Sequence, residues 1–144
     1  MAAIAVTAGN VLAGANAVKR LKTAGATVTA GQVVYESGGL VYLAQCDGTL
    51  AEATAIGVTL GGAAANQPVL VDIEDDDFTP GGTLVLTAAG GAGVVILSAT
   101  AGGLEMAVTA TMPLSGNYPV LLGAAKTTTK MYLHITPPGG PLTA

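Results

Sequence analysis

The chain has 144 residues, 51% of them hydrophobic and 10% charged, with five lysines and arginines in total and a formal net charge of −4 at pH 7. So few basic residues exclude a phosphate-binding surface, and with it nucleic acid as a partner, while the length fits one domain with a single core. Because ordinary domains carry about 25% charged residues, we expect the large neutral surface of this chain to be covered in an obligate oligomer or a larger assembly.

Residues 1–24 are predicted to form an extended N-terminal arm. Met1 to Thr7 are small and mostly apolar, which is typical of a segment that lies against another surface. After them, Asn10 is a suitable N-cap for a short helix through Lys22, because its side chain can accept a hydrogen bond from the first turn. Gly25 would end this helix. The β-branched residues within the segment lower its helix propensity.

The following stretch, residues 25–73, has the pattern of four short β-strands. Valine, isoleucine, threonine and tyrosine dominate its apolar runs, and these residues fit a pleated, half-buried surface better than a helix face. Glycine pairs and an Asp-Gly pair between the runs are typical of tight turns and hairpins. The predicted strands are Thr27–Tyr35, Gly39–Ala44, Ala55–Leu60 and Gln67–Ile73.

Asp72-Ile-Glu-Asp-Asp-Asp77 is the only run of charges in the chain. Alternating carboxylates suggest calcium, but Pro80 stands where a calcium-binding loop requires its glycine, and Leu86 stands where it requires the closing glutamate. We therefore interpret residues 72–77 as a solvated turn that joins the two parts of the chain, and we predict no metal site there.

Further strands are expected after this run, with a loop between Pro113 and Pro119. Their predicted ranges are Thr83–Thr87, Gly93–Ser98, Glu105–Thr111, Val120–Ala125 and Lys130–Thr136. Residues 137–144 include Pro-Pro-Gly-Gly-Pro and are predicted to be a loose C-terminal tail. The sequence therefore predicts one β-domain over residues 25–136, placed between the arm and the tail.

The second group of strands repeats the first in the same order. The matching segments are Gly39–Ala44 with Gly93–Ser98, Ala55–Val58 with Leu121–Ala124, and Val69–Ile73 with Met131–Ile135. Two units of roughly 50 residues indicate two similar halves, although Gly/Ala/Thr-rich sequence also aligns with itself by chance. The predicted fold class is all-β: a small single-domain β-barrel or sandwich, made as one unit or as two similar halves, with an extended N-terminal arm.

No arrangement of reactive side chains suggests catalysis or a cofactor. Cys46, the only cysteine, lies in an apolar run without basic neighbours, so we interpret it as a core residue with an inert thiol. His134, the only histidine, falls in an alternating strand pattern with no metal ligand nearby in sequence. Leu84 to Ala101 is uncharged and near the length of a membrane helix, but its glycines and missing flanking anchors argue against one. We predict no enzyme activity, cofactor, metal or membrane contact.

The order of several short segments along residues 10–135 resembles the capsid cement, or head decoration, proteins of tailed bacteriophages. The segments are Asn10-Val-Leu, Thr29–Tyr35, Ala55–Leu60, Gln67-Pro-Val69, Gly82–Leu86, Ile96–Leu104, Leu122–Ala125 and Leu133-His-Ile135. One departure is Asn66, where relatives usually carry glycine before Gln-Pro-Val. Because asparagine is the next most tolerant residue at positive φ, the turn is expected to survive.

The resemblance implies a small all-β protein that forms a homotrimer and binds the major capsid protein. Such a protein is made in the host cytoplasm and ends on the outer surface of the virion, where it stabilises contacts between capsid subunits. The family has no catalytic residues to carry over. The competing class is a head-fibre or tail-associated β-domain that binds host-surface glycans, although aromatic residues for such a site are few. An enzyme subunit that contributes only scaffold is a third, weaker alternative.

The N-terminal arm is the predicted capsid anchor. Lys19, Arg20 and Lys22 are three of the five basic residues, and in an acidic protein they would set orientation and encounter rate at an acidic capsid surface. Ile4 and Val6 would then supply lasting apolar contact. The alternative is that the same segment completes the sheet of the protein's own trimer.

Overall fold

The computed structural model of the chain describes residues 2–86, 93–107 and 117–138. Within these ranges the protein is almost entirely β, which confirms the predicted fold class. The strands are β1 (Ala2–Ala3), β2 (Val18–Ala24), β3 (Val33–Ser37), β4 (Leu40–Leu43), β5 (Ala55–Thr59), β6 (Pro68–Phe78), β7 (Val94–Leu97), β8 (Leu104–Met106), β9 (Leu121–Ala125) and β10 (Met131–Thr136). Two short helical turns accompany them, a 3₁₀ turn at Ala8–Asn10 and α1 at Leu50–Ala53.

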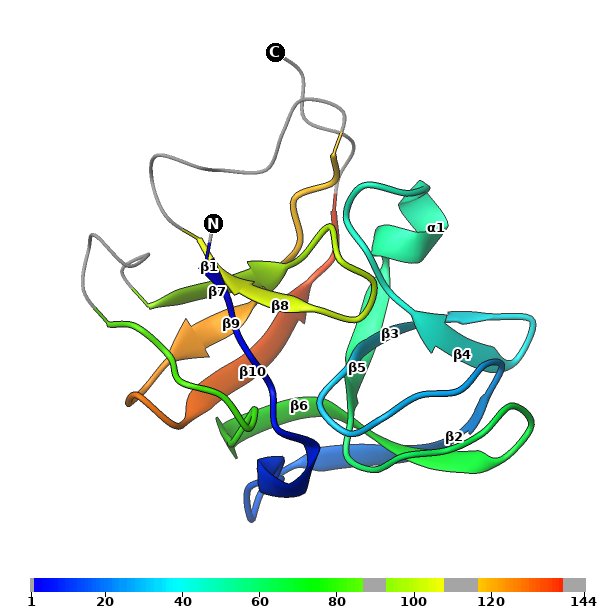
Figure 1. The fold of residues 1–144 in the computed structure, drawn as a ribbon, viewed down its shortest axis with the longest axis horizontal. Helices are drawn as coiled ribbons and strands as arrows, with labels where there is room; N and C mark the ends of the chain where they lie inside the picture. The colour runs from blue at the N-terminus through cyan, green and yellow to red at the C-terminus, as the bar shows by residue number, and fades with distance from the viewer. Residues whose placement is uncertain (1, 87–92, 108–116, 139–144) are drawn as a thin grey trace.

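Strands β2 to β6 close into a five-stranded barrel, on the right of Figure 1. The order is β6-β2-β4-β3-β5, and the antiparallel pairing of β5 with β6 completes the ring. Small side chains fill the interior, namely Ala24, Val28, Val34, Val41, Ala63, Val69 and Val71. Closure removes the free sheet edges that these strands would otherwise expose.

The predicted helix from Asn10 to Lys22 is wrong, because residues 18–24 form β2. This strand pairs antiparallel with β6 from Val18 opposite Glu74 to Thr23 opposite Pro68, and it also pairs in parallel with β4. Hydrogen bonding along two neighbours outweighs a weak helix propensity. The predicted boundary between an arm and a β-domain at residue 24 therefore falls within the sheet.

Strands β7 to β10 form a second, open half, on the left of Figure 1. Its order is β8-β7-β9-β10, and it joins the barrel where β10 pairs antiparallel with the C-terminal part of β6. At its other side, β1 adds Ala2 and Ala3 to β8. The predicted strand at Thr83 is not present over residues 83–86, while Thr87 and residues 108–111 lie outside the described residues.

The two halves share one pairing scheme. In the first half β3 pairs with β4 and β5, and β5 pairs with β6; in the second half β7 pairs with β8 and β9, and β9 pairs with β10. All six pairings are antiparallel. Val34 lies opposite Gly57 and Val95 lies opposite Gly123, and in each half the register shifts just after that pair. The halves therefore match residue by residue, bulge included.

This equivalence corrects part of the alignment predicted from sequence. The match of Ala55–Val58 to Leu121–Ala124 agrees with the strand pairing. The first strand of the second half, β7, corresponds to β3 and not to the segment that contains β4, and β10 is displaced by two residues from the predicted match with β6. Branched aliphatic residues dominate β7, and valine and tyrosine occur in both β3 and β4, so composition alone could not choose between these neighbouring strands.

The main core lies between the two halves. It brings side chains from the outer face of the barrel, including Val33, Ala55 and Val58, together with side chains from the second half. The latter include Val95, Leu97, Leu104, Met106, Leu122, Met131 and Leu133. Because Val34, Val41 and Val71 inside the barrel correspond to Val95, Leu104 and Met131, the inner face of the open half packs on the outer face of the barrel.

Candidate interaction surface

Strands β2 and β6 present an apolar pair to solvent on the outside of the barrel. Leu21 on β2 lies directly opposite Leu70 on β6, and these side chains are 70% and 38% exposed. Lys19 and Arg20, which precede Leu21, are exposed as well. Because successive side chains of a strand point to opposite faces, Lys19 shares the face of Leu21, whereas Arg20, opposite Val71, lies on the other face. A cross-strand pair of leucines with a cation on the same face can combine apolar contact with charge steering.

The structure separates the five residues predicted to anchor the protein. Ile4 is 8% exposed and belongs to the main core, and Val6 packs against that core. These two side chains complete the protein's own fold and are not free to hold a partner. Lys22 forms an ion pair with Glu36, with 2.8 Å between Nζ and Oε2. Lys19 and Arg20 are thus the predicted anchor residues that stay exposed, and β2 holds both.

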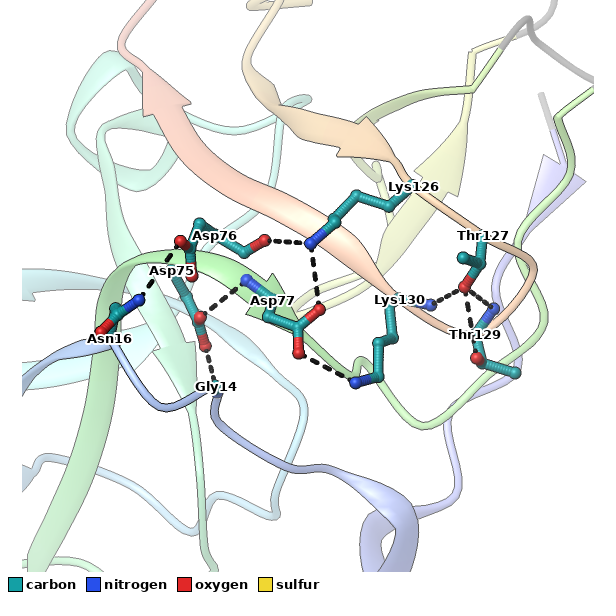
Figure 2. A network of polar contacts seen from close by, with 9 residues as sticks. All are labelled: Gly14, Asn16, Asp75, Asp76, Asp77, Lys126, Thr127, Thr129 and Lys130. Atoms are coloured by element: carbon teal, nitrogen blue, oxygen red, sulfur yellow. Dashed lines mark hydrogen bonds and ion pairs between the residues drawn. The ribbon is translucent and has the colours of Figure 1, made fainter.

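The acidic run is not the solvated turn predicted from sequence, because residues 72–77 continue strand β6. Asp75 is buried and accepts two backbone hydrogen bonds, from Gly14 N at 2.7 Å and from Asp77 N at 2.9 Å (Figure 2). Asp77 lies between two lysines, 3.0 Å from Lys126 Nζ and 2.9 Å from Lys130 Nζ. These contacts satisfy the carboxylates locally, so the strand can carry them across the junction of the halves.

The carboxyl groups of Asp77 and Asp72, both on β6, have pKa values that are shifted in opposite directions. Hydrogen bonds from Lys130 and Lys126 hold the pKa of Asp77 below its ordinary value. Burial, with the nearby Asp75 carboxyl, raises the pKa of Asp72 to about 8, although Lys19 acts to lower it. Neither carboxylate oxygen of Asp72 has a hydrogen-bond partner among the described residues. Asp72 is thus the unfavourable member of the run, because burying a charge without a partner is costly.

Reactive groups do not converge in the part of the chain that the structure describes. No three His, Cys, Asp or Glu side chains there are grouped so that they could hold a metal ion. His134 lies on β10, exposed, with Nδ1 3.2 Å from Glu74 Oε1. Cys46 is buried as predicted, and burial raises the pKa of its thiol, which disfavours the reactive thiolate. No helix in the described ranges is long and apolar enough to cross a membrane.

Sequence reasoning missed the exposed leucine pair. The run Val18-Lys-Arg-Leu21 combines apolar and basic residues without strict alternation, and we assigned it to a helix. The signal that could have found it is the β-branched Val18 and Thr23 at the two ends of a seven-residue run. The partner Leu70 could not be assigned, because register between distant strands is not written in either strand alone.

No protein-family model matches the chain, and no curated protein matches it significantly.

Proposed function

We propose that the protein is a capsid cement, or head decoration, protein of a tailed bacteriophage. In this proposal it binds the outer surface of the head as a homotrimer and stabilises contacts between major capsid subunits. The order of sequence segments along residues 10–135 supports the assignment, and so does an all-β body with few charges. The observation that carries it is the exposed pair of Leu21 and Leu70, with Lys19 on the same face of β2.

The barrel makes this surface suitable for holding large subunits together. β6 pairs with β2 from Val18 to Thr23, Leu21 included, and β4 fixes the end of the same strand at Thr23 and Ala24, so Leu21 is held on a strand of the closed barrel. A rigid contact surface loses little conformational entropy on binding. Lys19 and Arg20 would orient the acidic protein toward an acidic capsid surface, and the leucines would exclude water after contact.

The test is cosedimentation with heads of the phage that encodes the chain, followed by heating of the heads. We expect the wild-type protein to cosediment and to raise the temperature at which heads release DNA. Leu21→Asp, and separately Lys19→Glu with Arg20→Glu, should weaken binding while the melting temperature and the oligomeric state stay unchanged. Leu50→Asp is the matched control, because Leu50 is an exposed leucine on α1, away from Leu21 and the strand β2 (Figure 1). A wild-type protein that does not bind heads would contradict the proposal.

A second candidate function is binding of host-surface glycans by a head-fibre or tail-associated domain. One observation favours it: Tyr132 on β10 is about half exposed, and Lys126 Nζ lies 4.9 Å from the centre of its ring. Exposed aromatic rings beside polar groups are suited to stacking on sugars. A glycan array separates the two functions, because binding that disappears in Tyr132→Ala and persists in Tyr132→Phe, which keeps the ring, would support the glycan domain.

A further inference from the structure

Strand β6 brings two buried carboxyl groups to the same face of the sheet. Asp72 and Asp75 are three residues apart, a spacing that would place their side chains on opposite faces of a regular strand. Two consecutive residues of β2 lie opposite Asp72 and Glu74, however, so β6 carries one extra residue, a β-bulge. The bulge reverses the alternation: Asp72 and Asp75 are both buried, whereas Glu74 is exposed.

Asp72 has no positive partner for a negative charge. Neither of its carboxylate oxygens has a hydrogen-bond partner in the described part of the chain, and Lys19, which lies opposite it on β2, is exposed. On its other side, β5 has no charged residue and places Val58 opposite Asp72. On β10, His134 pairs with Glu74, which the bulge has turned to the other face. The acid Asp75 is therefore the polar group that Asp72 meets at close range.

One shared proton satisfies both carboxyl groups. Asp75 is arranged as an acceptor, because its oxygens accept hydrogen bonds from Gly14 N at 2.7 Å and from Asp77 N at 2.9 Å (Figure 2). Asp72, which accepts none, can donate an O–H to Asp75 if it is protonated. Burial and the hydrogen bond with the Asp75 carboxyl raise the pKa of Asp72 to about 8, so this proton is in place at neutral pH.

The acceptor of this pair also holds the segment of residues 12–17, which leads into β2. Leu12 at the start of the segment is fixed by two backbone hydrogen bonds with Thr79. Beyond it, the bond from Gly14 N to Asp75 ties the segment to β6, and Asn16 adds one long side-chain contact of 3.5 Å. A Cβ at Gly14 would collide with the Asp75 carboxylate, so the backbone lies directly against this group.

We propose that Asp72 and Asp75 form a proton-sharing latch, in which protonated Asp72 donates to Asp75 and keeps residues 12–17 on β6 until loss of the proton releases them. Without the proton, two negative charges repel one another in a buried site. Water can solvate them only when Gly14 leaves Asp75 and the segment opens. β2, which presents Leu21, begins directly after this segment, so the latch controls the entry to that strand. The latch itself does not require capsid binding.

The experiment measures hydrogen exchange of the Gly14 amide in the full chain by NMR, from about pH 5 to about pH 9. Opening releases one proton while Asp72 is protonated in the closed state only. We therefore expect the protection factor of this amide to fall about tenfold per pH unit up to about pH 8 and to stay constant above it. It should remain below the protection factor of the Val28 amide, which bonds to Ala63 O in the barrel, because the opening is local.

Two variants separate the latch from a general effect of pH. Asp72→Asn keeps an N–H donor for Asp75 but has no proton to lose, so its Gly14 protection factor should not change with pH. Asp47→Asn is the matched control, because it removes one exposed carboxylate from the loop before α1, and it should behave as the wild type does. A pH dependence that persists in Asp72→Asn, or equal protection of Gly14 and Val28, would overturn the proposal.

A second measurement on the wild-type chain reports the proton directly. The ¹³Cγ chemical shifts of Asp72 and Asp75, recorded after dialysis against a chelator, should show one protonated carboxyl at neutral pH. Two ionised carboxyls would contradict the latch. Protection of Gly14 at alkaline pH that returns when Ca²⁺ is added would contradict it as well, since the pair would then hold a cation in place of the proton.

Discussion

The two halves of the protein use the same strand pairing, yet only the first closes into a barrel. The difference lies in the additional strand that pairs with each half, which is β2 in the first half and β1 in the second. β2 has seven residues and pairs with β4 on one side and β6 on the other, whereas β1 has two residues and pairs with β8 alone. Closure is thus decided by a strand outside the repeat, and the repeat itself fits either state.

The cores of the two halves reflect this difference. Inside the barrel, Val41 and Val71 are enough to fill the space between strands. Their equivalents in the open half are Leu104 and Met131, which are longer and belong to the core shared by both halves. An open sheet must extend its side chains to a neighbouring surface, while a closed barrel has its own opposite wall close by.

The largest expected effect comes from removing the strand that closes the barrel. Deletion of residues 2–22 leaves only Thr23 and Ala24 of β2, so β6 loses its pairing with Val18 to Lys22 and the barrel opens between β6 and β4. We expect a chain without a cooperative unfolding transition, measured by circular dichroism on heating. Deletion of Ala2 and Ala3 is the control, because it removes β1 alone and should leave cooperative folding. A cooperatively folded chain after the longer deletion would mean that β2 is not required for closure.

A smaller effect tests whether the halves are equivalent. A Cβ at Gly57 would collide with the carbonyl oxygen of Asp72, and a Cβ at Gly123 with that of Tyr132, at matching positions of the two halves. Gly57→Ala and Gly123→Ala should each lower the free energy of unfolding by about 1–3 kcal/mol, the usual cost of overpacking. Gly61→Ala, with no atom near its Cβ, should stay within about 0.5 kcal/mol of the wild type in denaturant titrations. A loss at only one of the two buried glycines would break the equivalence.

The last expected effect concerns Asp72 and is confined to alkaline pH; its equivalent in the open half is the uncharged Tyr132. Because burial raises its pKa to about 8, the folded state binds a proton more tightly than the unfolded state. Stability from this group is therefore complete below the ordinary pKa near 4 and is lost as the pH rises through about 8.

Asp72→Asn removes that dependence. At about pH 8 and above we expect the variant to exceed the wild type in free energy of unfolding by about 1–3 kcal/mol, the cost of a buried polar group without a partner. Near pH 4 the two proteins should be similar, since both side chains are then neutral. Urea titrations across this range measure the difference. A variant that is less stable than the wild type at alkaline pH would show that the Asp72 carboxylate has a favourable partner.

The residue pattern by itself determined the positions of the last two strands in each half. β-Branched runs separated by glycine turns place β5, β9, β10 and the first part of β6 where they were predicted, and they revealed a duplication in Ala55–Val58 and Leu121–Ala124. These signals are local, because pleating and turn conformation depend on a few consecutive residues. For the candidate surface, sequence pointed to Lys19 and Arg20, which are exposed, and to Ile4 and Val6, which lie in or against the main core.

Tertiary structure alone decided which strand closes the barrel and which leucines meet. Val18–Ala24 becomes a strand because β6 pairs with it from Val18 to Thr23 and β4 pairs with its last two residues, and Leu21 meets Leu70 only through the register with β6. In the same way, residues 72–77 remain in strand β6 because Gly14, Lys126 and Lys130 come to them from distant parts of the chain. Leu70, Gly14, Lys126 and Lys130 are each more than 40 residues in sequence from the residues they contact, beyond the reach of any local pattern.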